Sequence, residues 1–234
     1  MTKKSTSAKA GKKKSIDKKV DFDKSKKYSI EEAVEISKKH SKTKFDASVE
    51  IHFNLSINPK KGEQQIRSTV SLPHGTGKSI KVAAFVTPDK EKEVKKAGAD
   101  FVGGEDLINE IKKSEKTDFQ VAVAEPAIMK DLGKIAKILG TRGLMPSPKN
   151  ETITPDPAKA VEELKKGKVS FKNDDTGNLH SVIGKISFDN EKLVENYNSF
   201  LDAVKKVRPV STKGAYINNV SISSSMGPGV KVEI

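Results

Sequence analysis

The sequence predicts an α+β fold of two domains, one of which is inserted into the other. Apolar and polar residues alternate over parts of residues 28–75 and 167–234, as they do in half-buried antiparallel strands. Between these segments, over residues 76–166, short apolar strands alternate with helical patterns, which is typical of a three-layer, Rossmann-like α/β domain. Neither outer segment has enough strands to close a core alone, so we expect both to form one discontinuous α+β domain with an antiparallel sheet.

The charge of the chain is concentrated at its N-terminus. The 234 residues carry a formal net charge of +13, which favours a polyanionic partner such as nucleic acid or an anionic membrane surface. Residues 1–27 hold 11 Lys and 3 Asp among Ser, Thr, Gly and Ala, the composition of a disordered basic tail. Two interpretations of this tail stay open: it attracts phosphates without sequence preference, or it only keeps the chain in solution.

Several classes of protein are disfavoured by composition. The chain has no Cys, which excludes disulfides and thiolate chemistry and suits a reducing cytosol. Its longest wholly apolar run, 82–86, is far too short to span a membrane, and no apolar stretch follows the N-terminal lysines. The four His occur singly, without the spacing of a metal site. We therefore expect a cytoplasmic protein without cofactor, metal or membrane partner.

The first segment is expected to begin with a helix. Ser29 and Glu32 have the spacing of a capping box, and apolar residues follow at helical spacing. Strict alternation over residues 49–57 then predicts a strand with one buried face and one face that meets water or a ligand. A turn at 58–62 leads into a second strand at 66–72.

The middle segment is expected to alternate strands with helices. The expected strands cover 80–86, 100–102 and 119–124, and the expected helices cover 89–97, 104–114, 127–139 and a final stretch that buries Val161 and Leu164. Helices of this length between strands require right-handed crossovers, so the sheet is expected to be parallel with a helical layer on each face.

The last segment returns to antiparallel patterns. Strands at 169–172 and 179–183 flank the turn-rich residues 173–177, which predicts a hairpin. The remaining expected elements are a helix at 189–206, a strand at 215–222, a serine- and glycine-rich turn at 223–229 and a final strand at 230–233. The turn is suited to ribose hydroxyls and phosphates, although a merely flexible turn has the same composition.

Residues 72–79 contain Gly-Lys-Ser and resemble a phosphate-binding loop. Such a loop needs an earlier glycine where this chain has Leu72, and it needs a helix after Ser79 where a strand is expected. A nucleotide-using enzyme, with Lys78 and Ser79 at the phosphates, is therefore only the alternative function. We interpret the segment instead as one of two connections between the domains, the other lying near Gly167.

Six short stretches carry a family resemblance. They are Phe45–Glu50, Thr69–Gly75, Gly98–Gly104, Gly143–Lys149, Phe171–Gly177 and Ser225–Gly229. In this order they resemble the ribosomal protein uL1 family in its bacterial form, over residues 28–234. Any one of them would be a weak match, whereas six in the family's order are specific.

The resemblance implies a function and a set of RNA-contacting residues. It implies a structural constituent of the large ribosomal subunit, not an enzyme, that binds 23S rRNA in the mobile stalk near the E site. It also implies assistance in the release of deacylated E-site tRNA and repression of translation from the chain's own-operon mRNA. The RNA-binding residues that it implies are Lys44, Phe45, Glu50, Lys172, His180, Lys185, Asn219, Ser221, Ser225, Met226 and Gly227.

Overall fold

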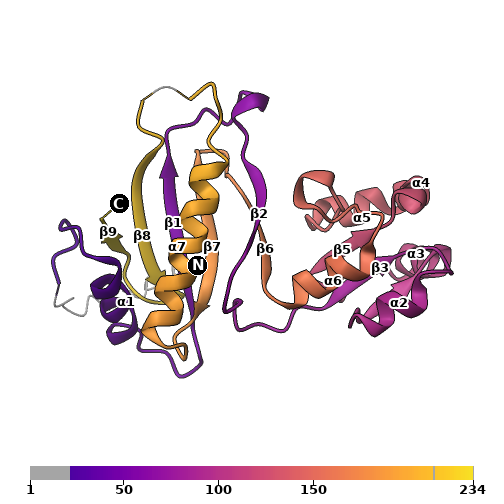
Figure 1. Cartoon of the computed structure of the whole chain (residues 1–234), viewed down its shortest axis with the longest axis horizontal. Coiled ribbons are helices and arrows are strands. Elements are labelled where there is room, and N and C mark those ends of the chain that lie inside the picture. The colour runs from indigo at the N-terminus through magenta and orange to yellow at the C-terminus, as the bar shows by residue number, and fades with distance from the viewer. Residues whose placement is uncertain (1–21, 213, 234) are drawn as a thin grey trace, which may run out of the picture.

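The structure has two groups of helices and strands that are joined by the strands β2 and β6 (Figure 1). It is a computed structural model that describes residues 22–212 and 214–233, so most of the predicted basic tail lies outside the described residues. One group contains an antiparallel sheet and the other a parallel sheet. The predicted two-domain α+β fold is therefore confirmed.

The larger group is built on a four-stranded antiparallel sheet with the strand order β7-β1-β8-β9. Its strands are β1 (Ser48–Leu55), β7 (Asn178–Lys185), β8 (Ile217–Ser224) and β9 (Val230–Val232). β1 lies between β7 and β8 and pairs with both, so the first and last parts of the chain share one sheet. This is the discontinuous domain that the separate β patterns predicted.

Two helices, α1 (Ile30–Lys39) and α7 (Asn190–Lys206), pack on one face of this sheet. β1 buries its alternate residues from Val49 to Leu55 there, and the rings of Phe53 and Phe200 stack with centroids 5.8 Å apart. α1 begins with the predicted capping box, in which the Ser29 hydroxyl accepts from the backbone N–H of Glu32 at 3.3 Å. The opposite face of the sheet carries the polar residues of β1.

The smaller group is a three-layer α/β unit around a parallel sheet of order β4-β3-β5. Its strands are β3 (Val82–Phe85), β4 (Phe101–Gly103) and β5 (Val121–Ala124). The helices α2 (Glu91–Lys96) and α6 (Pro157–Lys165) pack against Val82 and Ala84, whereas α3 (Glu105–Ser114) and residues 126–141 pack against Ala83 and Phe85. The two helical layers follow from the alternate directions of neighbouring side chains in β3.

One predicted helix is wrong in its continuity. Instead of a single helix at 127–139, the chain forms η2 (Pro126–Ile128), α4 (Met129–Leu132), η3 (Gly133–Ile135) and α5 (Ala136–Thr141). The backbone tightens at Gly133, whose carbonyl accepts from the N–H of Ala136, three residues on. Glycine has a low helix propensity, and apolar spacing does not distinguish an α turn from a 3₁₀ turn.

The predicted hairpin at 169–183 is also wrong. β6 (Lys168–Lys172) pairs with β2 (Arg67–Ser71) in a separate two-stranded sheet, while β7 pairs with β1. After the end of β6, Asn173 forms an isolated bridge with Leu179 of β7. The Asn173 side chain accepts from the N–H of Ile66 at 2.7 Å, which holds the end of β6 beside β2 and lets the turn lead into the other sheet.

The two connections between the groups meet at a pair of glycines. A Cβ on Gly167 would lie 2.5 Å from the Cα of Gly75, and both glycines have positive φ, 110° and 62°. Asn196 of α7 fastens the first connection, because its amide accepts from the N–H of His74 at 3.1 Å and donates to the carbonyl of Gly75 at 3.0 Å. Residues 72–79 thus lead from β2 to β3 and have no helix after Ser79.

Candidate RNA-binding surface

The face of the four-stranded sheet opposite α1 and α7 is polar, and we call it the open face. Residues paired across antiparallel strands point to the same side of a sheet, so the β1 residues that do not enter the core share this face with their partners. The open face consists of Glu50, His52 and Asn54 on β1, Asn178, His180 and Val182 on β7, Asn219, Ser221 and Ser223 on β8, and Lys231 on β9. It is dominated by uncharged donors and acceptors.

A serine- and glycine-containing turn lies at one end of this sheet. The N–H of Ser225 donates to the carbonyl of Ser48 at 3.1 Å, and the N–H of Ser48 donates to the Ser225 hydroxyl at 3.2 Å. Ser48 begins β1 and is paired with Lys185, which ends β7. We call this the sheet end; it gathers Lys44, Phe45, Lys185, Ser225, Met226 and Gly227.

Two large apolar side chains are exposed at the sheet end. Phe45 is 60 % exposed and Met226 is 76 % exposed, so neither belongs to the core. Lys44 is exposed beside Phe45, whereas Lys185 lies 3.5 Å from the carboxylate of Asp46. An accessible ring and an accessible cation at one edge of a polar sheet can stack on a base and attract a phosphate.

Gly227 is required by space and not by its backbone conformation. A Cβ at this position would lie 2.1 Å from the Oγ of Ser224, whose side chain is buried. The N–H of Gly227 donates to the carbonyl of Ser224 at 2.9 Å, which closes the turn tightly. A larger residue must therefore displace either the buried Ser224 hydroxyl or the turn that presents Ser225 and Met226.

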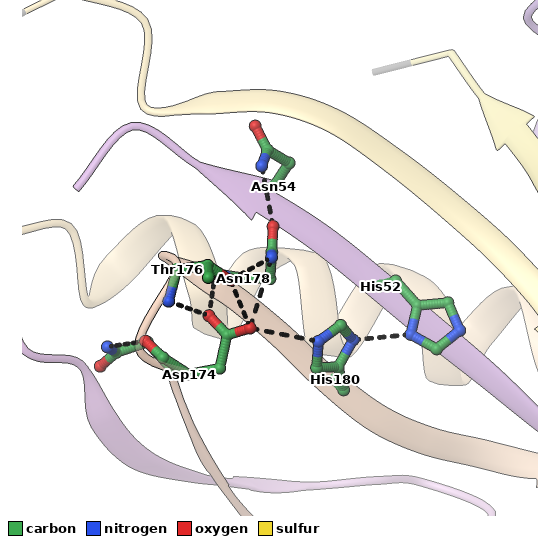
Figure 2. A network of polar contacts seen from close by, with 7 residues as sticks. His52, Asn54, Asp174, Thr176, Asn178 and His180 are labelled. Carbon is green, nitrogen blue, oxygen red and sulfur yellow. Dashed lines mark hydrogen bonds and ion pairs between the residues drawn. The ribbon is translucent and has the colours of Figure 1, made fainter. Parts of the chain in front are cut away.

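Polar contacts link the side chains at the other end of the open face (Figure 2). The Nδ1 atoms of His52 and His180 lie 2.8 Å apart, and the amide of Asn54 donates to that of Asn178 at 2.8 Å. The carboxylate of Asp174, in the turn before β7, lies 3.8 Å from the Nε2 of His180. These contacts hold the side chains of two neighbouring strands in fixed positions.

The surroundings lower the pKa values of two side chains in this network, Asp174 and His52. Hydrogen bonds from the Thr176 hydroxyl, then from the N–H groups of Asn178 and Thr176, hold the pKa of Asp174 well below its ordinary value. Burial, and then the neighbouring His180, lower the pKa of His52. At neutral pH, Asp174 is therefore ionised and His52 is neutral.

The residues implied by the sequence resemblance fall into three places. Glu50, His180, Asn219 and Ser221 lie on the open face, and Lys44, Phe45, Lys185, Ser225, Met226 and Gly227 lie at the sheet end. Lys172 is set apart from both, because it lies on β6 opposite Arg67 in the two-stranded sheet.

The open face also contains residues that the sequence reasoning did not select. They are His52, Asn54, Asn178, Val182 and Lys231, whereas Ser223 was considered only as the first residue of the serine- and glycine-rich turn. The alternation over residues 49–57 places His52 and Asn54 on the same side as Glu50, so this pattern could have identified them. The others depend on strand register, which the alternation does not reveal.

Other chemistries find less support in the described residues. Lys78 and Ser79 lie in the connection before β3, without the helix that a phosphate-binding loop requires. Over residues 22–212 and 214–233, no group of three or more His, Asp or Glu side chains is placed to hold a metal ion. Nor does any helix in that part of the chain have the length and apolarity needed to cross a membrane.

The fold has two domains, and one face of its larger sheet is polar and not covered by the helices α1 and α7. Comparison with known proteins identifies its family. The model of the "Ribosomal protein L1p/L10e family" matches residues 37–228, which is most of the chain. The chain belongs to this family, as the sequence resemblance predicted.

Curated relatives cover nearly the whole chain. The "Large ribosomal subunit protein uL1" of Mesoplasma florum is 52% identical over 212 residues, which cover 91% of this chain and 93% of the relative. Proteins with the same name from Thermosipho africanus and Kosmotoga olearia are 50% and 51% identical, each over 90% of this chain and 91% of the relative. These relatives are named as proteins of the large ribosomal subunit, which favours the ribosomal function over the nucleotide-using enzyme considered as the alternative.

Proposed function

We propose that the chain binds 23S rRNA in the mobile stalk near the E site, as a cytoplasmic constituent of the large ribosomal subunit. The observation that carries this proposal is the open face, where side chains from four strands present donors and acceptors beside the exposed Phe45 and Met226. Family membership and the ribosomal names of the relatives support it.

The chemistry of this surface fits folded RNA. Uncharged hydroxyl and amide groups on the open face suit the 2′-hydroxyls that RNA displays in its shallow minor groove. At the sheet end, Lys44 is placed for a phosphate and Phe45 for stacking on an unpaired base. Because Lys172 lies on β6 and not on the open face, it contacts the RNA only if the RNA extends beyond the edge of that face.

We propose the domain boundaries that the sequence suggested, with RNA binding assigned to one of the two domains. Residues 28–75 and 167–234 form the RNA-holding domain, and residues 76–166 form the inserted α/β domain. The basic residues 1–27 add attraction to phosphates that does not depend on sequence. Because Phe22 packs on Tyr28 with ring centroids 6.0 Å apart, the tail is best removed only up to residue 21.

Removal of residues 1–21 is expected to reduce the salt dependence of RNA binding. These residues carry 8 Lys and 2 Asp, and every phosphate contact that is lost lowers the slope of log K against log salt by about one. Binding titrations at several salt concentrations measure the slope, with an unrelated RNA of equal length as the control for specificity. An unchanged slope would show that the tail does not contact RNA.

Two further roles are proposed for the rRNA-bound and free protein. On the stalk, the chain assists release of deacylated E-site tRNA, and we expect ribosomes without it to release that tRNA more slowly in a dissociation assay.

In the free state, the chain represses translation of its own-operon mRNA by binding an RNA structure similar to that of the stalk. The stalk fragment should then compete with the mRNA for one protein site, and simultaneous binding of both would exclude the shared site.

Ligand protection against heat tests the RNA-binding proposal directly. All three Tyr of the chain, Tyr28, Tyr197 and Tyr216, lie outside residues 76–166, so tyrosine fluorescence follows the proposed RNA-holding domain. The stalk fragment at about 100 times its Kd should stabilise this domain by about 2.7 kcal/mol. ATP and GTP at millimolar concentration should leave it unchanged. An unchanged unfolding temperature of this domain with the stalk fragment would contradict the proposal.

A further inference from the structure

The two histidines of the open face are joined in a way that restricts their protons. A hydrogen bond between the Nδ1 atoms, 2.8 Å apart, needs a proton on one of these atoms and a lone pair on the other. The pair can therefore be neutral or singly charged with this contact intact. A second proton would put an N–H on both atoms and break the contact.

The surroundings decide which imidazole carries the single positive charge. The Nε2 of His52 lies 3.0 Å from the hydroxyl of Ser223, and its ring is the more buried of the two. His180 is 54 % exposed, and its Nε2 lies 3.8 Å from the ionised Asp174. His180 thus holds the charge and donates through Nδ1 to a neutral His52.

The charged groups around the pair are few. Glu50 neighbours His52 along β1, Asp174 faces His180 from the turn before β7, and Lys231 of β9 shares the face at the register of Ser221. The carboxylate of Asp174 already accepts four hydrogen bonds, from Thr176 and Asn178. It can therefore support a nearby cation while its oxygens stay engaged within the turn.

We propose that the His52–His180 pair is a phosphate-binding subsite of the open face that takes up a single proton when RNA binds. The exposed Nε2–H of His180 is beyond hydrogen-bond distance of Asp174 and is accessible to a phosphate oxygen. A bound phosphate favours the charged pair, so the complex takes up a proton from solution. This inference rests on the proposed rRNA binding and adds its regulation by pH.

The sign and size of the pH effect follow from linkage. Because the charged pair binds RNA better, RNA affinity rises as pH falls. If RNA raises the proton affinity of the pair tenfold, RNA affinity gains at most tenfold between the neutral and the singly charged pair. The uptake never exceeds one proton per complex, because the pair shares its proton.

Isothermal titration calorimetry in buffers of different ionisation enthalpy counts these protons on the full chain with the 23S stalk fragment. We expect the uptake to fall by the same amount in His180→Gln and in the double variant, because His180 holds the charge. In His52→Gln we expect a smaller loss, because His180 keeps its exposed Nε2 but loses the acceptor of its Nδ1–H. His40→Gln serves as the matched control, because His40 ends α1 beside Phe22, away from the open face. It should leave the uptake unchanged.

The outcomes separate this inference from the proposed function. Equal loss of proton uptake in His180→Gln and in the double variant, with a smaller loss in His52→Gln, supports the subsite. Normal RNA binding with unchanged uptake in the double variant overturns the subsite and leaves the RNA-binding proposal in place. Loss of more than one proton in the double variant overturns the shared proton. If the wild-type chain does not bind the stalk fragment, the proposed function fails, and the subsite fails with it.

Discussion

Replacement of Gly227 by Ala is expected to weaken binding of the stalk rRNA about tenfold to a hundredfold while the chain remains folded. The added Cβ would overlap the Oγ of Ser224, 2.1 Å away, and either this buried hydroxyl or the turn must move to relieve the contact. A move of the turn displaces Ser225 and the exposed Met226 from the sheet end, where close approach to RNA leaves little tolerance. A loss of this size corresponds to about 1.4–2.8 kcal/mol of binding free energy.

Filter-binding titration measures this effect, and two control variants isolate its cause. Gly229 lies in the same segment, but its added Cβ would meet no atom within 4 Å, so Gly229→Ala should bind normally. Ser224→Ala removes the atom that clashes, and the double variant with Gly227→Ala should recover most of the affinity. Wild-type affinity in the single Gly227→Ala variant would show that the turn does not contact the RNA.

Replacement of Asn196 by Ala is expected to lower the free energy of unfolding of the RNA-holding domain by about 2–4 kcal/mol. Asn196 is fully buried, and its amide accepts from His74 and donates to the carbonyls of Gly75 and Ile183. Without these contacts, three backbone groups lose their partner, and the connection that starts at His74 is no longer fixed to α7. Removal of a buried hydrogen-bond partner leaves the full desolvation penalty of the groups that remain.

Urea unfolding followed by tyrosine fluorescence tests this expectation, because every Tyr lies in the proposed RNA-holding domain. Asn198→Ala is the matched control, since Asn198 lies on the same helix but is exposed. It should be neutral or slightly stabilising, as Ala favours the helix more than Asn. Equal effects of the two substitutions would mean that the buried amide does not hold the connection.

The sequence pattern predicted which side chains face the core but not which strands pair. The alternation over 49–57 correctly placed Val49, Ile51 and Phe53 inside and Glu50 outside. The same kind of pattern at 169–183 led to a hairpin that does not form. Side-chain alternation records burial, whereas pairing is decided by long-range contacts, such as the bond from Ile66 to Asn173.

The candidate site shows the same limit. The six matched stretches implied the residues of the sheet end and four residues of the open face, Glu50, His180, Asn219 and Ser221. Most of these residues lie inside the matched stretches or within a few residues of them. They did not give His52 or Ser223, whose place depends on the register of β1 with β7 and β8. Lys172 was selected with the others, yet its strand belongs to the two-stranded sheet. The kind of ligand could therefore be inferred from local sequence, but which side chains lie close together could be seen only in the fold.

Ultraviolet cross-linking of the bound 23S stalk fragment, followed by mass spectrometry of the protein, tests the central claim most directly. If the open face and the sheet end hold the RNA, cross-links should occur in the peptides that contain Phe45, Met226 and residues 178–185, and should disappear with excess unlabelled stalk fragment. Cross-links confined to residues 82–165, the strands and helices of the α/β unit, would contradict this account.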